Sequence, residues 1–128
     1  MPADTAPPPE RNVLGTALEP CHPGLRAGYF RTGRCSTDAS DRGVHTVCAE
    51  VTDAFLAYSR GRGNDLVTPR PEFDFPGLRA GDAWCLCVDR WLEAEAAGVA
   101  PPVRLEATHE RTLVKAPLDR LRNPRKNP

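Results

Sequence analysis

Hydrophobic and polar residues alternate over residues 45–51, where His45, Val47, Ala49 and Val51 occupy every second position. Successive side chains of a strand project to opposite faces, so this period of two predicts a strand with one largely apolar face. The same pattern places the imidazole of His45 at the start of that face. We therefore expect residues 45–51 to line the core of the protein.

A short helix is predicted directly after this strand. Thr52 or Asp53 can cap its first turn, and Phe55 and Leu56 fall on one side of it. Glycines at positions 61 and 63 end the pattern, as glycine commonly does after the last helical turn. Residues 45–63 thus form a strand-to-helix unit.

A second unit of this kind follows a turn-rich segment at residues 76–82. The run from Trp84 to Val88 suits a strand, and Asp89 can cap a helix that extends to Gly98. The apolar positions 84, 88, 91 and 92 also fit helical spacing, so a single helix capped by Asp82 is the alternative. The pattern leaves both arrangements open.

The cleanest alternation lies near the C-terminus, in the segment from Val103 to His109, where Val103, Leu105, Ala107 and His109 share one face. Two prolines precede it, which argues against a central strand. We expect residues 45–51 and 103–109 to be antiparallel neighbours, with His45 and His109 at the same end of the sheet. Residues 112–115 predict a last strand, and Pro117 begins a turn of helix through Leu121.

These elements predict an α+β fold: a single compact domain with a short mixed or antiparallel sheet, two to three short helices and long irregular loops. The globular domain is expected over residues 12–121. The proline-rich residues 1–11 predict a disordered N-terminal tail, and residues 122–128 predict a disordered basic C-terminal tail.

Charge and composition narrow the classes of partner. Seventeen basic and seventeen acidic side chains give zero net charge, which excludes long-range steering toward nucleic acid or an anionic membrane. The chain has neither an export signal at its start nor a long apolar run, so we expect a cytoplasmic protein. In that compartment Cys48, Cys85 and Cys87 should be reduced and largely buried, with no disulfide among the five cysteines.

Several short motifs occur in an order that is typical of one family. They are Asn12–Gly15, Glu19–Cys21, His45–Cys48, Gly63–Leu66, Thr68–Phe73, Trp84–Cys87 and Glu106–Glu110. Over residues 12–121 the chain resembles the small bacterial family known as domain of unknown function 2237. The resemblance implies a compact cytosolic α+β domain and brings no substrate, cofactor or catalytic residue with it. At Arg34 the chain departs from the family, in which many members have a cysteine before the one matching Cys35.

The cysteines admit three interpretations. Cys85 and Cys87 are one residue apart, so on a strand both sulfur atoms project from one face. With Cys48 and His45 they could hold a soft metal such as zinc, although the chain lacks the usual Cys-x2-4-Cys spacing. Buried core cysteines are the second interpretation. Thiol chemistry is the third, with Cys87 as nucleophile beside a helix N-terminus and His109 as its catalytic partner.

The proline-marked segment after residue 60 is the candidate binding loop. Two prolines flank Arg70 and stiffen the chain, and the loop can present Asn64, Asp65, Arg70 and Glu72 to a small anionic or polar molecule. In the alternative, Arg70 pairs with Glu72 or Asp74 and the loop is a structural lid whose Phe73 and Phe75 fill the core.

Two functional hypotheses follow. In the first, the protein is a small ligand-binding or catalytic domain with one pocket lined by cysteine, histidine and arginine, with zinc as an optional cofactor. In the second, it is a non-catalytic interaction or scaffold module whose cysteines belong to the core. The sequence fixes neither the substrate nor the oligomeric state.

Overall fold

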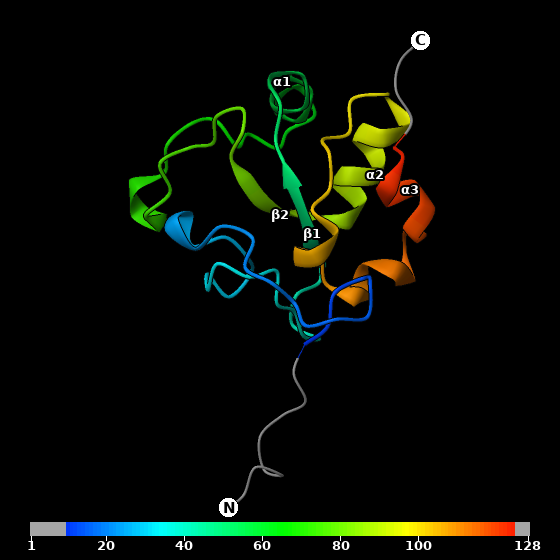
Figure 1. The fold of residues 1–128 in the computed structure, drawn as a ribbon. Helices are drawn as coiled ribbons and strands as arrows, with labels where there is room; N and C mark the ends of the chain where they lie inside the picture. The colour runs from blue at the N-terminus through cyan, green and yellow to red at the C-terminus, as the bar shows by residue number, and fades with distance from the viewer. Residues whose placement is uncertain (1–9, 125–128) are drawn as a thin grey trace, which may run out of the picture.

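The computed structural model describes residues 10–124, and these form a small α+β fold (Figure 1). The strands are β1 (His45–Glu50) and β2 (Ala83–Cys87), and the α-helices are α1 (Asp53–Gly61), α2 (Val88–Ala96) and α3 (Leu118–Arg122). Short 3-10 helices occur at η2 (Pro23–Leu25), η3 (Pro71–Phe73), η4 (Leu105–Ala107) and η5 (Glu110–Val114). The predicted fold class is confirmed.

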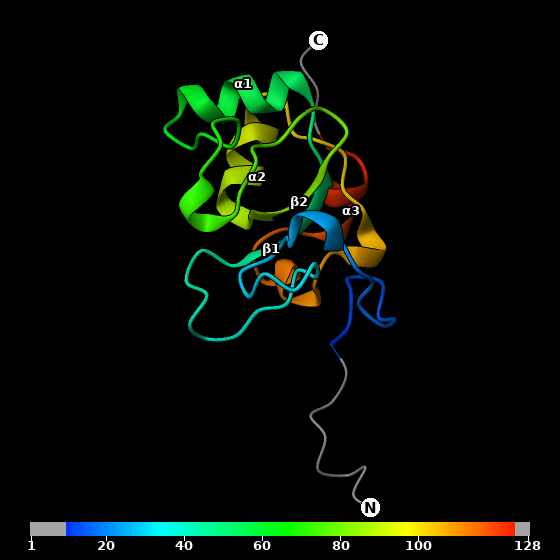
Figure 2. The ribbon, with the colours of Figure 1, turned by 90° about the vertical axis from the view of Figure 1, so that its left-hand side faces the viewer.

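The two strands form an antiparallel pair that separates two clusters of buried side chains. The larger cluster packs the sheet against the helices through Val47, Phe55, Trp91 and Leu121. The smaller one lies under the N-terminal segment and holds four of the five cysteines. Figure 2 shows this division: α1 and α2 lie above the sheet and the N-terminal segment, blue to cyan, lies below it. Residues 46–49 of β1 are consequently buried on both faces.

Both predicted strand-to-helix units are confirmed. The Thr52 hydroxyl accepts a hydrogen bond from the Phe55 amide at 3.1 Å and so caps α1. In the second unit β2 ends at Cys87 and α2 begins at the next residue, which excludes the alternative of a single helix from Asp82. The abrupt change puts the Cys87 side chain at the N-cap of α2.

The prediction of a strand over residues 103–109 is wrong, although the direction of the segment is as expected. Only Val103 forms a bridge to β1, opposite Ala49, and η4 follows it. The Thr108 hydroxyl takes the place of a backbone partner by accepting from the Cys48 amide at 3.1 Å. The segment still runs antiparallel to β1, because the His109 amide donates to Thr46 at 3.0 Å. The apolar residues of its alternating pattern pack against the core although the backbone is not a regular strand.

The C-terminal prediction is half confirmed. Residues 112–115 belong largely to η5 and not to a strand, because the amides of Thr112 and Lys115 donate to carbonyls three residues earlier. The helix after Pro117 is present as α3. Leu121 on this helix is 1% exposed and completes the larger core cluster.

The predicted tails fall mainly on residues 1–9 and 125–128, which lie outside the described residues. Arg11 is paired in a bridge with Ala17, and the amide of Glu110 donates to its carbonyl at 3.0 Å. At the other end, α3 extends to Arg122. No helix within residues 10–124 has the length and apolar character needed to cross a membrane.

Candidate functional site

Four cysteines form two disulfides, which overturns the prediction that they are reduced. Cys21 is bonded to Cys48, and Cys35 to Cys85. All four are at most 4% exposed, so the prediction of burial is correct for Cys48 and Cys85. Each bond joins the N-terminal segment to a different strand. The compartment argument failed because it considered exposure to a reducing environment and not the fold, which brings the four sulfur atoms together in a buried cluster.

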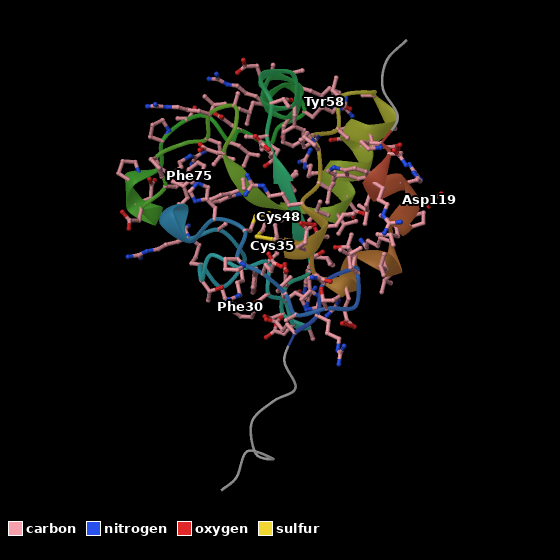
Figure 3. All side chains as sticks on the ribbon, in the orientation of Figure 1. Phe30, Cys35, Cys48, Tyr58, Phe75 and Asp119 are labelled. Carbon is pink, nitrogen blue, oxygen red and sulfur yellow. A yellow bond between two sulfur atoms is a disulfide. The ribbon has the colours of Figure 1, made fainter. Side chains whose placement is uncertain are left out.

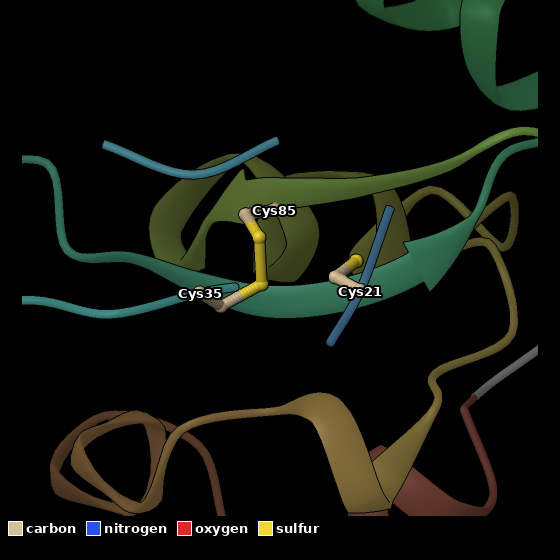
Figure 4. A group of neighbouring side chains, drawn as sticks. All are labelled: Cys21, Cys35 and Cys85. Atoms are coloured by element: carbon tan, nitrogen blue, oxygen red, sulfur yellow. A yellow bond between two sulfur atoms is a disulfide. The ribbon is translucent and has the colours of Figure 1, made fainter. Parts of the chain in front are cut away.

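The sulfur atoms of Cys21, Cys35 and Cys85 lie within 4.8 Å of one another (Figure 4), and Cys35 and Cys48 lie close together in Figure 3. This spacing results from two neighbouring disulfides. A soft metal binds thiolates, and a sulfur atom already bonded to another sulfur is not one. In this state the predicted zinc ligands Cys48 and Cys85 are therefore occupied, and the predicted set with Cys87 and His45 is not assembled.

Cys87 is the free cysteine, and it is half-buried. A β-bulge between His45 and Val47 sets its surroundings: beyond the bulge Cys48 pairs with Cys85, whereas at the end of the sheet His45 pairs directly with Cys87. Side chains of directly opposed residues project to one face. The extra residue therefore moves His45 off the apolar face predicted for it and onto the face of the cysteines, as bulges commonly re-aim a side chain.

The imidazole of His45 is oriented by a buried carboxylate. Its Nδ1 lies 2.6 Å from Oδ1 of Asp41, whose side chain is fully buried. The other oxygen, Oδ2, accepts from the His45 amide at 2.9 Å and from the Thr37 hydroxyl at 3.0 Å. A carboxylate held in this way favours the tautomer with hydrogen on Nδ1 and leaves Nε2 free to accept a proton.

The turn between Asp41 and His45 is strained. Val44 has φ +50°, a left-handed conformation that is unusual for a β-branched residue. Its carbonyl accepts from the amides of Thr46 and Val88, which ties the turn to both the bulge and the start of α2. Gly43 leaves room for the imidazole, because a Cβ there would lie 2.6 Å from the ring. Strain of this kind concentrates at functional sites.

Cys87 and His45 line one cavity of about 280 Å³, which we call the thiol cavity; its other lining residues are Asn64, Leu66, Trp84, Cys85, Leu86 and Arg90. Cys87 is also the N-cap of α2, where no side chain bonds the first turn. The Val88 amide donates to Val44, but the amides of the following residues in that turn have no side-chain cap and are available to an anion near the sulfur atom. The Cys87 thiol and the His45 imidazole are not hydrogen-bonded to each other in this structure.

His109, the predicted partner of Cys87, does not line the thiol cavity. Its backbone lies beside Thr46 at the same end of β1 as His45, as expected. However, its Nε2 is 3.1 Å from Glu10 and its Nδ1 accepts from the Arg111 amide at 3.0 Å. The two histidines thus have separate carboxylates, and the structure brings Cys87 to His45 and not to His109.

The four predicted residues of the proline loop have different surroundings. Asn64 lines the thiol cavity. Arg70 and Asp65 line a neighbouring cavity of about 290 Å³, whereas Glu72 is exposed beside it on η3. Asp65 holds the loop itself, since its carboxylate accepts from the Thr68 hydroxyl at 2.6 Å and from the amides of Val67 and Thr68.

The structural alternative for this loop is only partly realised. Asp74 pairs with Arg26 at 3.7 Å, and no described carboxylate pairs with Arg70. Phe75 is 9% exposed and belongs to the core, whereas Phe73 is 64% exposed. The backbone of Arg70 pairs with that of Phe75, which closes the loop tightly.

Two important residues of this region are absent from the sequence-based predictions. Asp41 is four residues before His45, but nothing in the pattern indicates that it is buried, since aspartate is usually exposed. Arg31 lines the 290 Å³ cavity from the N-terminal segment, which carries no regular pattern. The signal that could have pointed to Asp41 is the turn-forming run Asp41-Arg-Gly-Val-His45, in which an aspartate and a glycine precede a histidine.

Comparisons with known proteins agree with the motifs. A search of curated proteins found no match. A family model described as uncharacterized protein conserved in bacteria matches residues 11–125, which is nearly the whole chain and includes every residue of the thiol cavity. The chain, including the segments that carry Cys87 and His45, therefore belongs to the family known as domain of unknown function 2237.

Proposed function

We propose that this protein binds a small anionic or polar molecule and reacts with it through the thiol of Cys87. The observation that carries the proposal is the bulge in β1, through which His45 lies opposite Cys87 and both residues line one cavity. Asp41 completes the set by orienting the imidazole from a fully buried position. A nucleophile, a base and an orienting carboxylate in this order are typical of thiol-dependent catalysis.

The chemistry follows from these positions. The thiol proton of Cys87 passes to Nε2 of His45, and the sulfur atom bonds to an electrophilic carbonyl carbon of the bound molecule. The first-turn amides of α2 that follow Val88 stabilise the negative charge that forms on the carbonyl oxygen. The leaving group departs with the proton from His45, and water then hydrolyses the thioester. The net reaction is acyl transfer to water.

The two disulfides give the other four cysteines a structural role. Cys85 also lines the thiol cavity but is bonded to Cys35, so Cys87 is the reactive thiol of the folded, oxidised chain. The cytoplasmic location predicted from the sequence is retained here as a proposal. Burial of all four bonded cysteines slows their reduction, since exchange requires access of an attacking thiolate.

The proposal is tested by the rate at which iodoacetamide alkylates the folded protein at pH 7. Because Cys87 is the free cysteine, the loss of thiol reports this residue directly. His45→Gln removes the base, and we expect the alkylation rate constant to fall at least ~10-fold. Asp41→Asn should lower it in the same direction, because the imidazole loses its orientation.

His22→Gln is the matched control, since His22 is also half-buried and near a carboxylate, with Nε2 3.9 Å from Asp82. Its rate should equal that of the wild type. If the wild type and all three variants are alkylated at the same rate as a cysteine in an unfolded peptide, the Cys87 thiol is not activated. That result would favour the alternative, a non-catalytic interaction or scaffold module whose cysteines are core residues.

A further inference from the structure

We infer that the cavity beside the thiol cavity is an anion-binding subsite, formed by Arg31 and Arg70, for a molecule whose negative group is attached to a flat apolar body. This cavity, here called the arginine cavity, has a volume of about 290 Å³ and is also lined by Asp65, Leu66, Phe73, Phe75 and Trp84. The inference deepens the proposed function, and rests on it, by naming the class of molecule that the thiol would meet.

The first argument is the unsatisfied guanidinium of Arg31. Its Nε is buried and has no hydrogen-bond partner among the described residues. A buried donor without a partner costs about 1–3 kcal/mol, so such a group persists where a ligand can satisfy it. Arg31 is also held at φ +60°, with its amide donating to Gly28 at 3.0 Å. The backbone is thus fixed in an uncommon conformation that brings this side chain to the cavity.

The second argument is charge. Two other arginines of these segments are paired, Arg26 with Asp74 at 3.7 Å and Arg60 with Asp65 at 3.8 Å. Neither Arg31 nor Arg70 has an acidic partner within the described part of the chain. Two uncompensated guanidinium groups on one cavity favour an anion, and their planar donors match a carboxylate or a phosphate.

Asp65 is the one carboxylate among the residues that line the arginine cavity, and it does not neutralise the two arginines. Its oxygens are engaged by Thr68, by the Val67 amide and by the charge of Arg60. These interactions bind it to its own loop and to α1. The net charge of the groups that face the cavity is therefore positive.

The third argument is the apolar wall. The rings of Phe75 and Trp84 are in contact, with centroids 5.2 Å apart, and Phe73 is 64% exposed beside them. A large exposed aromatic side chain next to unpaired arginines is typical of a surface that contacts a flat ligand. Leu66 and Trp84 line both this cavity and the thiol cavity, so the two share a wall. A molecule anchored at the arginines can extend along that wall toward Cys87.

Binding of benzoate and of phenyl phosphate tests the inference, with chemical shifts of the Trp84 indole and of the Arg70 amide as the readout. We expect both signals to move. The probe that binds more tightly shows whether the subsite prefers a carboxylate or a phosphate. Arg70→Gln should raise the dissociation constant at least ~10-fold, because one charged hydrogen-bond donor is lost. Arg31→Gln should do the same. Benzamide, which is uncharged, should bind at least ~10-fold more weakly than benzoate.

Arg34→Gln is the control, because Arg34 is an exposed arginine of the same segment that lies outside the cavity and its loss changes the net charge equally. Equal weakening by this variant, or unchanged binding in Arg70→Gln, would overturn the subsite. Cys87→Ala separates the two proposals. Benzoate that binds to this variant as to the wild type supports the subsite even where alkylation has shown no activated thiol.

Discussion

Asp65 shows how one side chain can fix a loop that has no regular structure. The hydroxyl of Thr68 and the amides of Val67 and Thr68 donate to its carboxylate, and the charge of Arg60 lies 3.8 Å away. The Thr68 hydroxyl, the largest cause, and the two amides lower the pKa of Asp65 from 3.8 to about 2. The folded loop thus prefers the ionised carboxylate, which organises the residues leading to Arg70.

This preference makes the loop sensitive to acid. Because the pKa of Asp65 is lower in the folded chain than in the unfolded chain, its stabilisation is complete above about pH 4 and is lost as the pH falls toward about 2. In Thr68→Ala the pKa of Asp65 should rise toward 3.8, and an NMR titration of its carboxyl carbon measures this. Asp38, whose pKa is lowered mainly by the Ser40 hydroxyl, is an internal reference that should not change. An unchanged Asp65 titration would contradict this account.

At the scale of elements, the strands and helices that were predicted correctly from the sequence are those with local signals. The cap at Thr52 and the alternation that begins at His45 act within a few residues, so β1 and α1 could be predicted. Residues 103–109 alternate equally well, but Thr108 bonds β1 through its hydroxyl and breaks the ladder. Nothing in a binary pattern distinguishes a side-chain bond of this kind from a backbone bond.

The candidate site was predictable to a smaller extent. Cys87 was identified because a strand followed by a helix is a local feature. His45 was assigned as a metal ligand, and its position opposite Cys87 depends on a bulge within a strand that is buried on both faces, where alternation carries no information. Asp41 depends on the positive φ of Val44, for which the sequence offers no signal. The disulfides depend on contacts between segments far apart in sequence.

An ion pair joins the short helix α3 to α2. Arg120 bonds Glu95 of α2, whose carboxylate is fully buried. Arg120→Met keeps the length of the side chain but removes the positive charge from this buried carboxylate. We expect the free energy of unfolding to fall by about 1–3 kcal/mol, less than for a fully buried pair, because Arg120 is partly exposed. Urea denaturation followed by circular dichroism measures the change.

Arg122→Met is the control on the same helix. Arg122 is exposed and has no ion pair within the described residues, so its change should stay within ~0.5 kcal/mol. Equal stability of the two variants would show that α3 is held by Leu121 in the core and not by the ion pair.

For the whole molecule, the disulfides replace the regular structure that the first third lacks. Residues 10–44 contain η2 as their only described helix, yet this segment covers one face of the sheet (Figure 1). Cys21 and Cys35 bond it to β1 and β2 respectively. The two bonds span 27 and 50 residues, so each restricts the unfolded chain considerably.

Removing one of these bonds should therefore lower stability strongly. For the double variant Cys21→Ser, Cys48→Ser we expect the free energy of unfolding to fall by about 2–5 kcal/mol, measured by urea denaturation. Cys87→Ser leaves both bonds and should change stability by less than ~1 kcal/mol. Mass spectrometry of the unreduced protein should show the loss of two hydrogen atoms per bond. A native mass that equals the reduced mass would disprove the pairing.

The connectivity of these bonds also has a consequence for biosynthesis. Along the chain the cysteines occur in the order 21, 35, 48, 85, and the bonds interleave, since the first cysteine pairs with the third and the second with the fourth. The ribosome therefore releases three of them before the partner of Cys35 exists. Cys35 must wait as a thiol, or leave a wrong partner by exchange, until β2 emerges. The Cys35–Cys85 bond can therefore form only after β2 has been synthesised, and Cys87 is synthesised two residues after Cys85.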